Sequence, residues 1–167
     1  MKMIVAVDQN WGIGRQNGLL FSIREDMRFF KNTTMGGAVI MGSKTLLSLP
    51  GGRPLPGREN MVLSRKGNFS TEGIALFRSA DTLFDRLRER DTSQCYVIGG
   101  AAIYSLLMDY CDTAYITKVC ADGKAEVFLR DMDAQPNWVL TSCSGLHRQG
   151  PLSFRFCTYR NRMVKPM

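Results

Sequence analysis

The chain has little of what metal-binding and membrane proteins need. It contains one histidine, His147, and its cysteines never have CxxC spacing, which speaks against a zinc site. The five cysteines are Cys95, Cys111, Cys120, Cys143 and Cys157. No apolar run approaches the roughly 18 residues of a membrane span, and the start, MKMIVAVDQN, enters a strand-like run without a secretory pattern. We therefore expect a cytoplasmic protein without a resident metal, in which most cysteines are buried small hydrophobes.

Repeats, linkers, low-complexity segments and recognised nucleic-acid motifs are also missing. The length fits one domain spanning residues 1–167, and 44% hydrophobic with 22% charged residues is typical of a globular protein. The 22 lysines and arginines exceed the 15 aspartates and glutamates, which gives a net charge of +7. Because the basic residues are spread along the chain, we expect small anionic ligands and no nucleic acid.

Short apolar runs alternate with helical patterns over most of the chain. The runs that predict buried strands are residues 3–7, 38–41, 60–63 and 96–98, and the predicted helices are 23–33, 43–49, 80–90 and 101–108. This alternation predicts right-handed crossovers and a largely parallel sheet. After a strand over 113–119 the helices stop, and residues 138–144 and 154–161 are typical of a closing antiparallel pair. The fold class is therefore α/β.

The helix predicted near residue 23 carries two different carboxylates. Ser22 and Glu25 have the spacing of a capping box, in which each side chain satisfies a free N–H at the helix start. The predicted interior face consists of Ile23, Met27, Phe30 and Thr34. Asp26 stands at the edge of that face, where a carboxylate is costly without a partner. A solvated first-turn aspartate, favoured by the helix dipole, is the alternative interpretation.

Two strand-to-helix junctions and one long loop are candidate ligand-binding segments. The junctions begin at Gly42-Ser43-Lys44-Thr45 and at Gly99-Gly100-Ala101-Ala102. They would lie at the carboxyl ends of parallel strands, where ligands bind and free N–H groups favour phosphate. Neither matches GxGxxG or a P-loop, and glycine can serve packing alone. The glycine-rich loop over residues 8–21 ends in apolar residues, which suits a segment that closes over a ligand; an ordinary surface connection is the alternative.

The order of these motifs resembles the dihydrofolate reductase family, specifically its bacterial chromosomal type, over nearly the whole chain. The matching segments are Ile4-Val-Ala6-Val, Gly12-Ile-Gly14, Glu25-Asp26-Met27…Phe30-Lys31, Val39-Ile-Met-Gly42, Pro50-Gly-Gly-Arg53-Pro-Leu-Pro-Gly57-Arg58, Val62-Leu-Ser64-Arg65, Val97-Ile-Gly-Gly-Ala…Tyr104 and Tyr115-Ile-Thr117-Lys118. Ordered motifs at matching spacing are far more specific than one glycine turn. The resemblance implies a single α/β domain with a mostly parallel eight-stranded sheet, an antiparallel C-terminal edge strand and four flanking helices.

The resemblance also implies a reaction and a substrate site. The expected activity is NADPH-dependent reduction of 7,8-dihydrofolate to 5,6,7,8-tetrahydrofolate by hydride transfer to pterin C6 and protonation of N5, in one-carbon metabolism. A monomer that also binds antifolate inhibitors is expected. Asp26 would hold the pterin 2-amino group and N3, and Thr117 would support that carboxylate; with Phe21 they form the predicted catalytic set. Arg58 would bind the α-carboxylate of the glutamate tail, which its planar fork suits. The predicted substrate-binding residues are Ile4, Val5, Ala6, Asp26, Met27, Phe30, Leu55, Arg58, Ile98 and Thr117.

The cofactor site is implied in the same way. Ala6, Ile13 and Leu19 would meet the nicotinamide, with Leu19 at a position often held by methionine. The two junctions would hold the phosphates, and in the family the adjacent glycines are joined by a cis peptide bond. The predicted cofactor-binding residues are Ala6, Ile13, Gly14, Leu19, Gly42, Ser43, Lys44, Thr45, Leu63, Ser64, Arg65, Ile98, Gly99, Gly100, Ala101, Ala102, Ile103 and Tyr104.

Three further positions depart from the family's pattern. Phe21 replaces a tryptophan, so a hydrogen bond from an indole N–H is absent there, and Arg24 stands where proline commonly precedes the acid. Ser43 replaces an arginine often found beside the adenosine 2′-phosphate. Lys44 and Arg65 are left as the cations for that phosphate.

Two other functions fit parts of the sequence. A riboflavin-pathway reductase shares the architecture and nicotinamide use but reduces a ribose, and a ribosyl phosphate has no use for a pterin-binding carboxylate such as Asp26 followed by Arg58. A basic nucleotide- or RNA-binding module without catalysis would need exposed aromatic residues interleaved with basic ones on a sheet face. No such run is visible.

Overall fold

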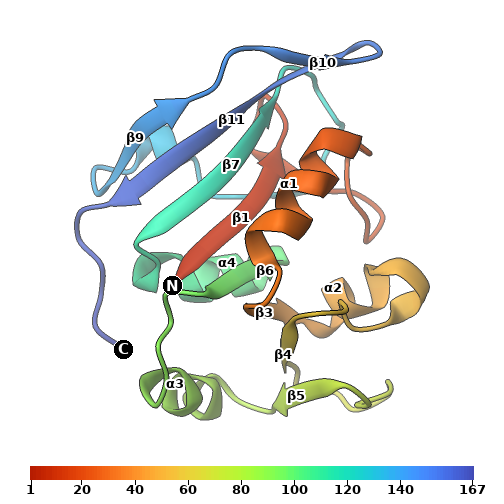
Figure 1. Ribbon diagram of the computed structural model, residues 1–167, viewed down its shortest axis with the longest axis vertical. Coiled ribbons are helices and arrows are strands. Elements are labelled where there is room, and N and C mark those ends of the chain that lie inside the picture. The colour runs from red at the N-terminus through yellow and green to blue at the C-terminus, as the bar shows by residue number, and fades with distance from the viewer.

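Strands and helices alternate along the chain as predicted, in a computed structural model that describes all 167 residues (Figure 1). The strands are β1 (Lys2–Val7), β2 (Gly12–Gly14), β3 (Ala38–Gly42), β4 (Glu59–Leu63), β5 (Ile74–Phe77), β6 (Cys95–Gly99), β7 (Thr113–Val119), β8 (Val127–Phe128), β9 (Trp138–Cys143), β10 (His147–Gln149) and β11 (Leu152–Asn161). The helices are α1 (Arg24–Thr34), α2 (Ser43–Ser48), α3 (Ala80–Arg88) and α4 (Ala101–Leu107). Single 3₁₀ turns lie at Pro50–Gly52, Met108–Tyr110 and Met132–Ala134.

One large sheet forms the centre of the molecule (Figure 1). Its strand order is β10-β11-β7-β1-β6-β3-β4-β5. All pairings from β7 to β5 are parallel, and β11 runs antiparallel to β7. β9 and β10 both pair with the edge of β11 that β7 leaves free, so the sheet is eight strands wide. The predicted mostly parallel, eight-stranded sheet with an antiparallel C-terminal strand is confirmed.

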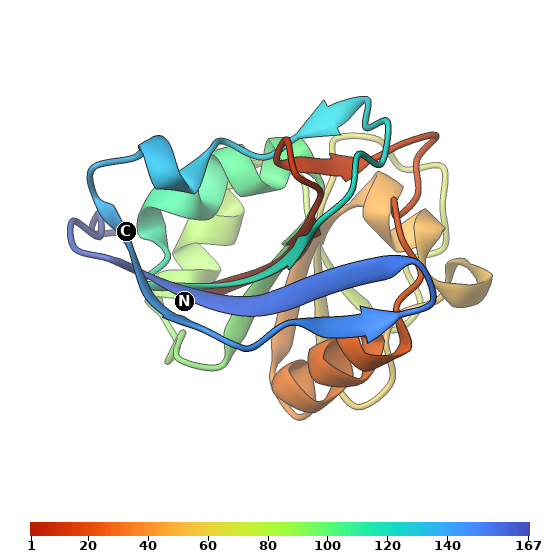
Figure 2. The ribbon, with the colours of Figure 1, turned by 90° about the horizontal axis from the view of Figure 1, so that it is seen from above.

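Helices cover both faces of this sheet. α1 lies on one face, and α3 and α4 lie on the other (Figure 2). Alternate side chains of β3 point to opposite layers. Ile40 packs in the cluster that contains Leu83 of α3 and Leu107 of α4, whereas Met41 packs with Leu46 of α2. A strand covered on both faces is apolar throughout, which is why this segment gives a continuous run rather than an alternating pattern.

The parallel strands end at a common edge, where the strand order reverses. From β1 the chain moves outward through β3, β4 and β5, then returns through β6 and crosses to β7 on the other side of β1. In open α/β sheets, ligands bind outside the carboxyl ends of the strands at such a reversal. The ends of β1, β3, β6 and β7 therefore locate the candidate site.

The predicted capping box is wrong. The residue that precedes α1 is Ile23, and no side chain caps the helix from that position. Glu25 instead pairs with His147, with 2.9 Å between Oε1 and Nδ1. Ser22 contributes only its carbonyl oxygen, which accepts a hydrogen bond from Gln149 Nε2 at 2.9 Å. A contact from a distant strand therefore replaces the local motif.

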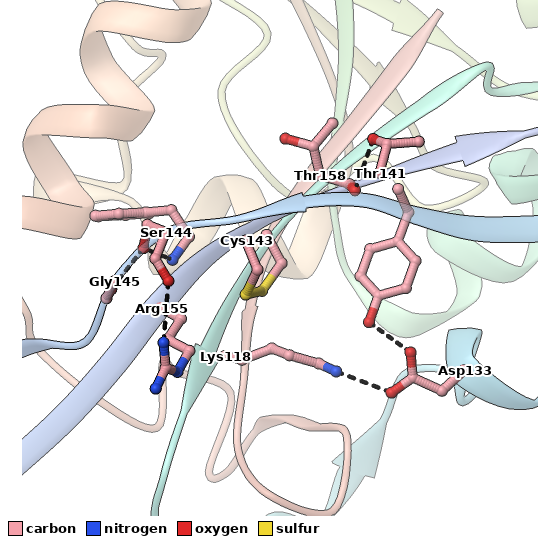
Figure 3. Close-up of a disulfide and its surroundings, with 11 residues drawn as sticks. Lys118, Asp133, Thr141, Cys143, Ser144, Gly145, Arg155 and Thr158 are labelled. Atoms are coloured by element: carbon pink, nitrogen blue, oxygen red, sulfur yellow. Dashed lines mark hydrogen bonds and ion pairs between the residues drawn. A yellow bond between two sulfur atoms is a disulfide. The ribbon is translucent and has the colours of Figure 1, made fainter.

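The cysteines agree with the prediction only in part. Cys95 and Cys111 are buried and free, and Cys120 is exposed. Cys143 of β9 and Cys157 of β11 face each other in the strand pairing and form a disulfide (Figure 3), which was not predicted. The antiparallel register brings the two sulfurs together, and nothing in their spacing along the chain indicates this pairing.

None of the helices combines the length and apolar character needed to cross a bilayer.

Candidate active site

Asp26 lies in the first turn of α1 and reaches β7 through its carboxylate. Thr117 Oγ1 donates a hydrogen bond to Asp26 Oδ1 at 2.6 Å, and Thr117 itself is 2% exposed. Burial raises the pKa of Asp26 above its ordinary value, and the hydrogen bond from Thr117 opposes part of that rise. The site thus holds a half-buried carboxyl group with increased proton affinity, which suits acid–base chemistry.

The predicted interior face of α1 is confirmed at Ile23 and Thr34, which are buried, but it is wrong at Met27. Met27, expected to face the interior, is 53% exposed. Phe29 also contacts the sheet, and its ring lies 4.9 Å from that of Phe156 on β11. Each helical residue advances by about 100°, so a stripe that contains Ile23 and Phe29 also turns Asp26 toward the sheet.

Strand β1 forms the floor beside this carboxylate. Ala6 lies opposite Thr117 in the β1–β7 register, and Ile4 is buried. Tyr104 Oη donates a hydrogen bond to the Ile4 carbonyl oxygen at 2.9 Å, which ties α4 to β1. Burial raises the pKa of Tyr104, so the phenol stays neutral and serves as a donor.

Arg58 reaches back to α1 from the segment before β4. Its Nη1 donates to Thr34 Oγ1 at 3.1 Å and its Nε donates to the Pro56 carbonyl at 3.0 Å. Burial lowers the pKa of Arg58, but a guanidinium remains charged in proteins.

Asn60, which we did not predict, holds the segment before β4 through three hydrogen bonds of 2.9 Å to the backbone of Leu55 and Arg58. Its signal was an amide inside an apolar strand, where a polar side chain needs partners.

The two glycine junctions lie side by side. Met41 is opposite Gly99 in the β3–β6 register, and the Gly99–Gly100 peptide bond is cis, as the resemblance implies. A Cβ on Gly99 would come within 3.2 Å of the Tyr104 ring, and one on Gly100 would lie 3.6 Å from Thr45 Oγ1. Gly99 also has a φ of 121°, which favours glycine. This bare backbone between two strand ends fits the close approach that a dinucleotide pyrophosphate requires.

The predicted cations for a 2′-phosphate are exposed. The side chains of Lys44 and Arg65 make no hydrogen bond or ion pair. Arg78, which we did not predict, donates from Nη1 to the Arg65 carbonyl at 3.5 Å. Ser64 is buried, and its hydroxyl bonds to the backbone of Lys66. The segment after β4 therefore presents positive charge to solvent next to the glycine junctions.

Asp8 anchors the glycine-rich loop. Its Oδ1 accepts hydrogen bonds from the Asn10 and Gly12 N–H groups at 2.8 Å each, and its Oδ2 accepts one from the Gly123 N–H at 3.0 Å. The loop continues as β2, which contains Ile13 and pairs with β8. Sequence reasoning missed Asp8; its signal was an aspartate directly after a strand and before asparagine and glycine, a pattern typical of an Asx turn.

At the end of this loop, the predicted site residues Leu19 and Phe21 differ in burial. Leu19 is 79% exposed, so it is not packed with the other predicted cofactor residues. Phe21 is partly buried and packs against the cluster of Ile23, Val119 and Phe154. A Cβ on Gly123 would meet the Phe21 ring at 3.1 Å, which shows how closely the segment after β7 covers the loop.

Comparison with known proteins gives a consistent result. The chain matches a family model described as dihydrofolate reductase over residues 1–161. The dihydrofolate reductase of Bacillus subtilis (strain 168) is 31% identical over 164 residues, which cover 97% of this chain and 95% of that protein. That of Mycobacterium leprae (strain TN) is 38% identical over 144 residues, covering 80% and 85%.

Among solved structures, dihydrofolate reductase from Enterococcus faecalis, complexed with NADP(H) and RAB-propyl, is similar with a TM-score of 0.83. The two are 24% identical, and the match covers 96% of this chain and 95% of that one, so it supports the fold. The family match and the relatives above 30% identity agree along almost the full length, and this chain therefore belongs to the dihydrofolate reductase family.

Proposed function

We propose that this chain reduces 7,8-dihydrofolate to 5,6,7,8-tetrahydrofolate with NADPH, and that Asp26 anchors and polarises the pterin. Membership of the family supports the reaction. One observation supports the role of Asp26: a half-buried carboxylate at the carboxyl edge of the sheet, oriented by the Thr117 hydroxyl at 2.6 Å.

NADPH, when bound, supplies the hydride that C6 of the pterin receives. The chain's own residues hold the pterin and assist protonation of N5. Asp26 accepts hydrogen bonds from the 2-amino group and N3–H, while Thr117 keeps the carboxylate turned toward the ring. The negative charge of Asp26 increases the proton affinity of the bound ring, and water delivers the proton to N5. No nucleophile is required.

The remaining predicted residues are assigned to binding. Ile4, Val5, Ala6, Phe30, Leu55 and Ile98 would line the pterin pocket. Met27 would also line the pocket, Leu19 would meet the nicotinamide, and Phe21 would belong to the catalytic set. Arg58 would bind the α-carboxylate of the substrate. The two glycine junctions fit the cofactor phosphates because glycine itself has no side chain that would keep a phosphate away from the backbone N–H groups. Lys44 and Arg65 would hold the 2′-phosphate and so favour NADPH over NADH.

All these assignments fall on one chain, so we treat residues 1–167 as one catalytic domain that acts as a monomer. Light scattering of the purified protein at micromolar concentration tests the monomeric state, and a stable dimer would contradict it.

We place the enzyme in the cytoplasm, where its substrate and cofactor occur; cell fractionation with activity measurement checks that assignment.

The decisive experiment follows NADPH absorbance on addition of dihydrofolate to the wild type and to Asp26→Asn. The amide keeps the shape and the acceptor for Thr117, so the fold should persist while the rate at neutral pH falls about 10²–10⁴-fold. As the pH falls, solution protonates N5 directly and part of the activity should return. Glu25→Gln is the matched control, because glutamine still accepts from His147. A larger loss in Glu25→Gln than in Asp26→Asn would contradict the assignment.

A further inference from the structure

The start of α1 is completed by a residue 125 positions away in the chain. The first N–H groups of a helix have no partner within it, and no side chain near Ile23 supplies one. The Gln149 side chain on β10 does so: its Oε1 accepts from the Arg24 N–H at 2.8 Å, and its Nε2 donates to the Ser22 carbonyl at 2.9 Å. One amide therefore pairs with the backbone on both sides of Ile23, as a neighbouring strand would.

A second side chain of β10 reaches the same turn. His147 is two residues before Gln149, and such residues point to the same side of a strand. Its Nδ1 lies 2.9 Å from Glu25 Oε1. The ring is stacked on Phe154 at 5.5 Å and meets the edge of Phe156 at 5.2 Å. These rings restrict the histidine, so its contact with α1 has a fixed direction.

Between the residues that make these polar contacts lies Ile23, whose apolar side chain is buried. Ile23 is 2% exposed and belongs to a cluster with Phe154 of β11 and Val119 of β7. The glycine-rich loop ends just before this point, at Phe21, and Asp26 follows three residues after Ile23. The β10–β11 hairpin therefore contacts the chain through hydrogen bonds, an ion pair and apolar packing at the boundary between the loop and helix α1, which carries Asp26.

We propose that Gln149 is a positioning residue for Asp26, holding the start of α1 so that the carboxylate keeps its hydrogen bond with Thr117. The inference rests on the proposed function, because substrate bound through Asp26 is its readout. The Asp26–Thr117 bond joins α1 to β7 at 2.6 Å. A displacement of about 1 Å at one end takes such a bond out of range and can cost catalysis heavily.

Three variants separate positioning from general stability. Gln149→Ala removes both amide bonds. Gln149→Glu keeps an acceptor for the Arg24 N–H at the helix start, where a negative charge is favourable, but it loses the donor to the Ser22 carbonyl oxygen and therefore isolates the first bond. Arg148→Gln is the matched control, because Arg148 lies on the same strand and its side chain makes no hydrogen bond or ion pair.

In Gln149→Ala, kcat/KM for dihydrofolate should fall about tenfold, equivalent to about 1.4 kcal/mol. Most of the change should appear in the KM for dihydrofolate, with the KM for NADPH unchanged. Gln149→Glu should recover the part of the loss that belongs to the Arg24 N–H bond, and Arg148→Gln should match the wild type. If Gln149→Ala does not fold, Gln149→Met, which keeps the length without polar groups, replaces it.

Other outcomes overturn the proposal. An active wild type with Gln149→Ala indistinguishable from Arg148→Gln shows that the contact positions nothing. Equal increases in the KM for dihydrofolate and for NADPH, without recovery in Gln149→Glu, show general loosening instead. A wild type that does not reduce dihydrofolate at all is a failure of the proposed function, and it is identified by that measurement alone.

Discussion

Replacing Thr117 by valine removes one hydrogen bond from the site and changes little else. Thr117 is buried on β7, and its hydroxyl donates to Asp26 Oδ1 at 2.6 Å. Valine is also β-branched and suits a strand, so the backbone should be retained. A hydrogen bond to a charged group contributes about 1.5–3 kcal/mol. We therefore expect kcat/KM for dihydrofolate to fall about 10- to 150-fold.

The same substitution should change the pH dependence. The Thr117 hydroxyl lowers the pKa of Asp26 against the rise that burial causes. Without it the pKa rises further, so the midpoint of the pH–rate profile should move to higher pH. A carboxyl whose pKa is higher in the folded than in the unfolded state costs stability above its unfolded pKa, and the cost is complete above the folded one. Thr117→Val should therefore lose more stability at neutral pH than near pH 4, close to the ordinary value of 3.8.

Steady-state kinetics across acid to mildly alkaline pH, together with thermal unfolding at both pH values, provide the measurement. Thr117→Ser is the control, because serine keeps the hydroxyl and should keep most of the activity and the wild-type midpoint. If valine leaves both kcat/KM and the midpoint unchanged, or if serine is as damaging as valine, the role given to the Thr117–Asp26 bond is refuted.

Arg58→Lys should raise the KM for dihydrofolate, because an ammonium cannot reproduce the two parallel bonds of a guanidinium; a folate analogue truncated before the glutamate should not distinguish the variants, and equal losses for both ligands would indicate misfolding. Lys44→Ala and Arg65→Ala should each raise the KM for NADPH by an amount equivalent to about 1.5–3 kcal/mol while barely affecting NADH. A wild type that uses both cofactors equally would contradict that assignment. Reducing the Cys143–Cys157 disulfide, which joins residues 14 apart, should lower the thermal unfolding midpoint by about 6–12 °C, since closing such a loop is worth about 3 kcal/mol. Identical midpoints with and without reductant would show that the bond adds no stability.

The sequence predicts the main elements well because the covered strands and amphipathic helices carry strong local patterns. All four helices lie within two residues of their predicted bounds, and β7 matches the predicted residues 113–119. The short strands β2, β5, β8 and β10, of two to four residues each, were not predicted. Such segments become strands only because a partner lies beside them, as β8 does for β2, and no local pattern encodes that partner.

In the candidate site, too, features set by local sequence could be predicted, and features set by distant contacts could not. Asp26 could be singled out because its cost at the edge of an apolar face is a local property. The exposure of Met27 could not, because it depends on which distant side chains meet the helix, as Phe156 of β11 meets Phe29. The capping box failed for a related reason: Gln149, distant in the chain, pairs with the Arg24 N–H and the Ser22 carbonyl oxygen, and Glu25 pairs with His147.

The position of β1 in the sheet has a consequence for how the chain is made. β1 is the first strand synthesised, yet its neighbours are β6 and β7, and Lys2 pairs with Tyr96 on one side and Thr113 on the other. At about 5–20 residues per second, the ribosome needs roughly 5–20 s to deliver both partners. Strands β3, β4 and β5 are neighbours in both sequence and space and can pair within that time. The oldest strand of the nascent protein therefore waits longest for its partners, and until they arrive its apolar side chains are open to a chaperone or to another emerging chain.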